Sequence, residues 1–93
     1  MSLLTMSGRR GTVRIADTTK KTSATLPKIF TSIVVLLDGT KISHLKEAGY
    51  PDTATALAGH GITVDSELSK GEVIVTDVEF TEIQLSAGAV SIG

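Results

Sequence analysis

The chain has 93 residues and a net charge of −1, and 41% of its residues are hydrophobic although only three are aromatic. It contains no cysteine, which excludes disulfide bonds, thiolate zinc ligands and a thiol nucleophile. A chain of this length predicts one small domain whose core is built mainly from Ile, Val, Leu and Ala.

The near-neutral total hides an uneven distribution of charge. Residues 1–28 contain six cations and one anion, a net charge of +5, whereas residues 29–93 contain three cations and nine acids, a net charge of −6. Such asymmetry predicts that the protein selects its partner electrostatically, either a polyanion or the acidic half of another copy.

Residues 1–11 are rich in Ser, Gly and Arg, and we expect a flexible basic arm there, followed by a single domain over 12–93. The alternation of Val13 and Ile15 predicts a short strand at 12–15. Residues 17–28 are polar and end near a proline, which is typical of a long loop.

Residues 29–37 give the strongest strand signal in the chain, because the run 33–37 is apolar on both faces, as in a central strand covered on both sides. Asp38-Gly39 follows at once and is a favoured dipeptide of tight hairpins, since both positions tolerate positive φ. We therefore expect a hairpin with a short returning strand at 40–42.

The middle of the chain predicts two short helical pieces separated by Pro51, whose ring blocks continuation. Ser43 is expected to cap a turn over 43–48 that Gly49 ends. Asp52 is expected to cap a second piece over 53–58 that Gly59 ends.

The remaining residues return to strand patterns. Alternating apolar residues predict a half-buried strand at 62–68 with an acidic outer face. A long strand is predicted at 72–85, where apolar residues change from even to odd positions, so we expect a bulge near Thr81-Glu82. A turn at 87–88 leads to a last strand at 89–92.

These elements predict a single α+β domain, with a mixed or antiparallel sheet of about five strands and a short broken helix on one face. The expected core residues are Ile33, Val35, Leu37, Leu45, Leu57, Ile62, Val64, Ile74, Val78 and Phe80. The order of strand, Asp38-Gly39 hairpin, helix, 62–68 strand and Gly71-Glu72-Val73 turn into a strand resembles the ubiquitin-like β-grasp family over about residues 29–80. That resemblance implies a fold only, because the chain ends Val90-Ser91-Ile92-Gly93 and not in the Gly-Gly of the sulfur-carrier members.

No motif points to catalysis or to a cofactor. His44 and His60 are the only imidazoles, their spacing matches no metal-ligand motif, and we expect them to be structural or exposed to solvent. The chain lacks a G-x-S-x-G elbow and a glycine-rich phosphate loop. We therefore expect neither an enzyme nor a bound metal, cofactor or small-molecule substrate.

The longest apolar run has five residues, so we expect no membrane-spanning segment, and the N-terminus lacks a signal-peptide pattern. The expected location is the cytoplasm, or a particle assembled inside a host cell. The expected function is that of a small binding or assembly protein, either a homo-oligomer or a component of a larger particle of phage type.

In this hypothesis basic residues of one copy meet acidic residues of a neighbouring copy. The expected partner-binding residues are Arg9, Arg10, Arg14, Lys20, Lys21, Asp65, Glu67, Asp77 and Glu79. The same basic arm could instead follow a nucleic-acid backbone, although the chain offers few aromatic residues for base stacking. A third interpretation needs no partner, because the arm could fold back on its own acidic sheet.

Overall fold

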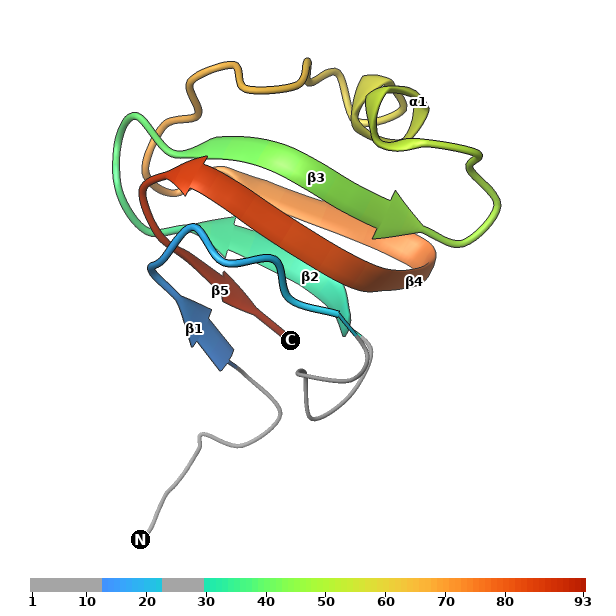
Figure 1. The fold of residues 1–93 in the computed structure, drawn as a ribbon, viewed down its shortest axis with the longest axis horizontal. Coiled ribbons are helices and arrows are strands. Elements are labelled where there is room, and N and C mark those ends of the chain that lie inside the picture. The colour runs from blue at the N-terminus through green and yellow to red at the C-terminus, as the bar shows by residue number, and fades with distance from the viewer. Residues whose placement is uncertain (1–12, 23–29) are drawn as a thin grey trace, which may run out of the picture.

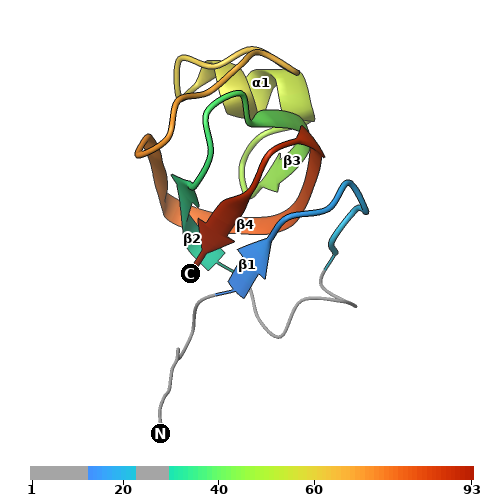
Figure 2. The same ribbon diagram turned by 90° about the vertical axis from the view of Figure 1, so that its left-hand side faces the viewer.

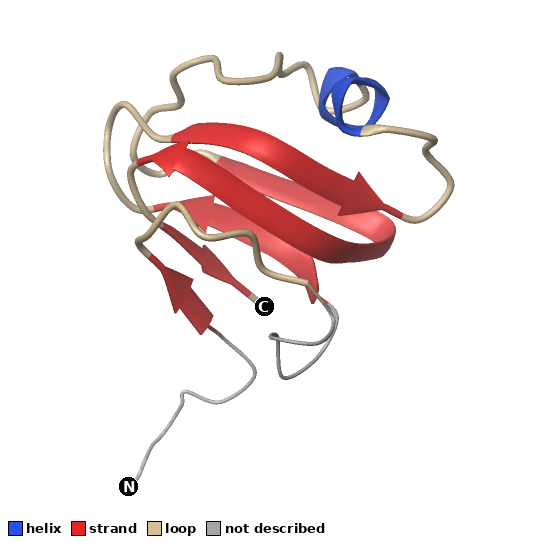
Figure 3. Cartoon of the chain, viewed as in Figure 1, coloured by secondary structure: helices blue, strands red, loops and turns tan. Residues whose placement is uncertain are grey.

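In the part of the chain that the structure describes, five strands form a single antiparallel sheet and one helix lies against it (Figures 1 and 3). The structure is a computed structural model and describes residues 13–22 and 30–93, so the expected basic arm lies outside the described residues. The elements are β1 (Val13–Ile15), β2 (Phe30–Val35), β3 (Lys41–Glu47), α1 (Thr53–Ala58), β4 (Val73–Ala87) and β5 (Val90–Ile92). The predicted α+β class with about five strands is confirmed, and the sheet, in the order β1-β5-β2-β4-β3, is antiparallel throughout.

The 15-residue strand β4 organises the sheet, because its first part pairs with β2 and its second part with β3. Lys46 lies opposite Glu82 while Glu47 lies opposite Phe80, so Thr81 is an extra residue on β4. This bulge confirms the prediction near Thr81-Glu82, and it keeps apolar residues on both sides of it facing the core. The sheet curls around that core (Figure 2).

The core confirms most of the expected residues, with Ile33, Val35, Leu45, Leu57, Ile74 and Phe80 buried and Ile62 packed against them. Three expected core residues are wrong, since Leu37, Val64 and Val78 are 49%, 42% and 48% exposed. Leu37 follows the end of β2, and Val64 lies in a loop. Val78 lies where the register between β2 and β4 is irregular, so simple alternation fails there.

The predicted hairpin at Asp38-Gly39 is wrong, because β4 lies between β2 and β3 in the sheet. Gly39 does adopt the positive φ that the dipeptide favours, at +80°, but the turn leads to a strand paired elsewhere. The predicted helical turn over 43–48 is also wrong, since these residues belong mostly to β3.

A bulge in β3 explains why residues 43–48 were predicted to form a helical turn. Ile42 lies opposite Leu85 and His44 lies opposite Gln84, so Ser43 is the extra residue. The buried positions 42 and 45 are therefore three residues apart, which is also a helical spacing. Ser43 caps no helix; its hydroxyl donates to the carbonyl of Gln84 at 3.2 Å.

Helix α1 agrees with its prediction. The Thr55 amide donates to the Asp52 carboxylate at 2.8 Å, which makes Asp52 the N-cap, and Gly59 follows the last helical residue.

The next segment, 62–68, forms turns and one isolated bridge to Thr40, so the predicted strand is wrong. The β-grasp order, which depends on that strand and on the hairpin, is not shown.

Candidate interaction surface

The predicted basic residues are placed only in part, since Arg9 and Arg10 lie outside the described residues. Arg14 is exposed on β1, at one edge of the sheet. Lys21 exchanges two backbone hydrogen bonds with Ile83 of β4, at 2.8 and 2.9 Å, and its ammonium lies 3.1 Å from the Asp17 carboxylate. This stretch of the basic region therefore packs against the chain's own sheet.

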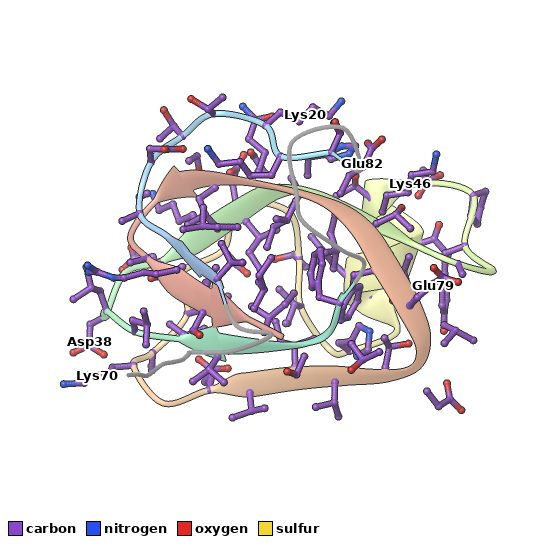
Figure 4. All side chains as sticks on the ribbon, turned by 90° about the horizontal axis from the view of Figure 1, so that it is seen from below. Lys20, Asp38, Lys46, Lys70, Glu79 and Glu82 are labelled. Carbon is purple, nitrogen blue, oxygen red and sulfur yellow. The ribbon has the colours of Figure 1, made fainter. Side chains whose placement is uncertain are left out.

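Lys20 also acts on the chain's own acidic residues. The pKa of Glu82 is held below its ordinary value, first by a hydrogen bond with His44 and then by the charges of Lys46, His44 and Lys20, with desolvation opposing them. Figure 4 shows Lys20, Lys46 and Glu82 in the same region of the molecule. Lys20 and Lys46 therefore favour the ionised form of Glu82.

The four predicted acidic residues form two groups and not one sheet face. Asp65 and Glu67 are exposed in the loop before β4, and the Asp65 amide bonds to Ile42 near the start of β3. Asp77 and Glu79 lie on β4 near the other end of β3, where the Glu79 carbonyl accepts from the Ala48 amide. Ile42 and Ala48, to which the two groups bond, are six residues apart. At about 3.3 Å per residue of strand, the two groups are separated by roughly 20 Å.

Glu79 of the second acidic group lines a surface pocket of about 410 Å³ beside the β4 bulge, which sequence reasoning did not predict. Its lining residues are Lys46, Glu47, Ala48, Glu79, Thr81 and Glu82. Within the described ranges, Glu79 has no ion-pair partner, so its carboxylate remains available to a cation. Figure 4 shows Glu79 and Lys46 on the same side of the molecule.

Glu47, which lines this pocket, is the one buried charged side chain among the described residues, at 4% exposure. His60 Nε2 lies 2.9 Å from its Oε1 atom, and the Thr76 hydroxyl donates to its Oε2 atom at 2.6 Å. Both oxygens therefore have partners, as burial of a carboxyl group requires. Sequence reasoning missed this network, although Glu47 lies two residues after Leu45 and so shares its inward face.

His44 belongs to a second network on the other face of β3. Its Nε2 atom lies 2.9 Å from Glu82 Oε1, and its Nδ1 atom lies 3.2 Å from the Thr53 hydroxyl, which accepts a hydrogen bond from the Leu45 amide. This network joins the start of α1 to the sheet. The two histidines contact different carboxylates, and the described ranges contain no cluster of three or more His, Asp or Glu suited to a metal ion.

The outer face of the sheet holds a second feature that the sequence did not reveal. Arg14, Ser91, Val34 and Val73 lie opposite one another across β1, β5, β2 and β4. Val73 and Val75 are 59% and 60% exposed. The prediction that the second strand is covered on both faces is therefore wrong within the described residues, because its outward Val34 is only half-buried.

Comparison with known proteins gives no identification: no protein-family model, curated protein or solved structure matches this chain. Within the part of the chain that the structure describes, no helix has the length and apolar character that a membrane span requires.

Proposed function

We propose that this protein is a non-catalytic assembly protein, which associates with copies of itself or joins a larger particle of phage type. The observation that supports this proposal is the acidic pocket beside the β4 bulge, in which Glu79 has no ion-pair partner among the described residues. The chain itself supplies a complementary group, because its first 28 residues have a net charge of +5.

The proposed contact brings a basic segment of one copy to the acidic pocket of its neighbour. Arg9 and Arg10 are adjacent in the sequence, and a guanidinium group binds a carboxylate with two parallel hydrogen bonds. Lys20 and Lys21 already act on acidic residues of their own chain, so the arginines are the better candidates for the intermolecular contact.

The second candidate function is nucleic-acid binding by the same region. Exposed Arg14 and Lys20 favour it, since cations bind phosphates without regard to base sequence. Against it, the exposed aromatic Tyr50 lies in the loop before α1, away from both residues in the sequence, and offers no stacking platform beside them.

Sedimentation velocity of the full chain tests both functions. We would measure its mass at about 0.01 M and about 1 M salt, between which the Debye length falls from roughly 30 Å to 3 Å. We expect a species heavier than the 9.7 kDa monomer at low salt and the monomer at high salt.

Variants identify the groups involved. Arg9→Ala with Arg10→Ala, and separately Glu79→Gln, should lower the mass at low salt. Glu72→Gln, at an exposed acid just before β4, is the matched control and should leave the mass unchanged. A chain that is monomeric at both salt concentrations contradicts the proposal, and one that changes mass only when a DNA or RNA duplex is added favours the second function.

A further inference from the structure

Both histidines of the chain contact residues that line the acidic pocket, and the proposed function uses neither of them. His44 Nε2 lies 2.9 Å from Glu82 Oε1, and His60 Nε2 lies 2.9 Å from Glu47 Oε1. Glu47 and Glu82 belong to β3 and β4, which pair on either side of the Thr81 bulge. Each pair therefore couples one carboxylate of the pocket to the ionisation of an imidazole ring.

The charge of the pocket depends on these two rings. Its lining residues include three glutamates and one lysine, a net charge of −2 when all four are ionised. Histidine is the side chain whose ordinary pKa lies between about pH 5 and pH 8, where glutamate and lysine side chains ordinarily keep their charges. Protonation of both rings therefore brings the combined charge of the pocket and its two histidines to zero.

The contacts of His44 suit either protonation state. Its Nδ1 atom lies 3.2 Å from the Thr53 hydroxyl, which also accepts a hydrogen bond from the Leu45 amide. A hydroxyl group has one donor and two acceptor sites, so Thr53 can donate to an unprotonated Nδ1 atom or accept from a protonated one. With one proton on Nε2, toward Glu82, the ring gains the second on Nδ1 without losing a hydrogen bond.

The contacts of Glu47 suit an ionised carboxylate. The Thr76 hydroxyl donates to its Oε2 atom at 2.6 Å, and its Oε1 atom faces His60 Nε2. Glu47 is buried, whereas the side chains of His60 and His44 are 18% and 27% exposed, so solvent can deliver protons to both rings. Protonation of His60 thus places a positive charge next to a carboxylate that remains in the pocket wall.

The groups that face the two histidines come from each element packed against them. β4 presents Glu82 to His44 and the Phe80 ring to His60, β3 presents Glu47 to His60, and α1 presents Thr53 to His44. Further titratable groups around the two pairs include Lys20, Lys46, Tyr50, Asp52 and Glu79. Side chains of these types ordinarily titrate outside the histidine range, so the two rings dominate the change of charge there.

We infer that the acidic pocket is a pH-controlled cation-binding site, which binds the basic segment of a neighbouring copy when His44 and His60 are neutral and releases it when they are protonated. This inference rests on the proposed function and names the regulation of the same site. Linkage is reciprocal, so a guanidinium group bound in the pocket opposes protonation of both rings.

Sedimentation equilibrium of the full chain at about pH 8 and about pH 5.5, in about 0.01 M salt, tests the inference. The dissociation constant should be about fivefold higher at the lower pH, which is the scale of one exposed ion pair. His44→Gln combined with His60→Gln should give nearly the same constant at both pH values, because glutamine donates a hydrogen bond but does not ionise. Glu72→Gln, outside the pocket, is the matched control and should keep the wild-type pH dependence.

NMR titration of the two imidazole rings supplies a measurement that does not depend on the folding of the histidine variants. At the same low salt, both rings should titrate at a lower pH in the wild type than in the variant with Arg9→Ala and Arg10→Ala, in which no guanidinium occupies the pocket. A fivefold change in the dissociation constant, divided between two protons, corresponds to about 0.3 pH unit for each ring. Equal titration in the two chains overturns the inference.

The outcomes separate this inference from the proposed function. A dissociation constant that does not rise at the lower pH, or that rises equally in the double histidine variant, overturns the inference. If association at about pH 8 still falls with Glu79→Gln, the proposed function stands without it. A wild-type chain that remains monomeric at about pH 8 and low salt contradicts the proposed function and overturns the inference with it.

Discussion

Replacement of Gly88 by alanine should be among the most destabilising single-methyl changes in the protein. Gly88 lies in the turn between β4 and β5 with a φ of +86°. A Cβ atom there would overlap the Thr40 hydroxyl oxygen and lie 2.5 Å from Thr40 Cα. Thr40 is fully buried and cannot move into solvent, so the methyl group meets the backbone of a core residue.

The expected cost has two parts. A left-handed φ costs a residue with a Cβ atom about 1–2 kcal/mol. Displacement of Thr40 also breaks the hydrogen bond that its hydroxyl donates to the Leu37 carbonyl at 2.7 Å and the bond it accepts from the Ala89 amide at 3.2 Å. At about 1 kcal/mol for each bond, the total loss of unfolding free energy is roughly 3–4 kcal/mol.

Gly49 provides a matched control, because its φ is +89° and a Cβ atom there has no neighbour within 4 Å. Gly49→Ala should therefore cost only the backbone part, about 1–2 kcal/mol. Urea unfolding followed by circular dichroism measures both values against a total stability of about 5–14 kcal/mol for a chain of this size. If Gly88→Ala costs no more than Gly49→Ala, the packing argument at Thr40 is refuted.

Two further predictions concern carboxylates. Glu47→Ala should lower the unfolding free energy, measured in urea, by about 3 kcal/mol, because it leaves His60 and Thr76 without their acceptor. Glu79→Ala, at a half-exposed carboxylate, should lower it by less than about 0.5 kcal/mol. Equal losses for the two variants would contradict the role of the buried network. The pKa of Asp52 is lowered from its ordinary value of 3.8, chiefly by the hydrogen bond from the Thr55 amide, so ionised Asp52 stabilises the fold above that pH and the contribution is lost as the pH falls through the lowered folded-state pKa. Asp52→Asn retains an acceptor but cannot ionise, so the difference in melting temperature between wild type and variant should be constant near neutral pH and shrink below about pH 4. A difference that stays constant at every pH where the chain is folded would contradict this.

The sequence was sufficient to predict elements that depend on local interactions. Asp52 and Gly59 mark the two ends of α1 as expected, because a helix cap depends on residues only three positions away. The change of phase along β4 located the bulge at Thr81, since a strand that keeps one face buried needs an extra residue there. β1, β2, β4 and β5 were likewise recognisable from their alternation or apolar runs.

The sequence was not sufficient to predict which strands pair when the pairing strand lies far along the chain. Asp38-Gly39 is a turn in the chain, yet β4, more than 30 residues later, inserts between the strands on either side of it. The bulge at Ser43 gave β3 a helical spacing, and only its register with β4 shows that it is a strand.

The candidate surfaces follow the same division. The sequence by itself determined the composition of the core, the helix cap and the separation of positive from negative charge along the chain. Only the tertiary structure decided which charges act within one molecule, because Lys20 and Glu82 are 62 positions apart in sequence and the pairing of Lys21 with Ile83 brings the Lys20 charge close enough to lower the pKa of Glu82. The tertiary structure also decided that Val73 and Val75 face outward while Ile74 faces the core. Strand alternation places the side chains of neighbouring residues on opposite faces, but the packing of the whole sheet selects which face is buried.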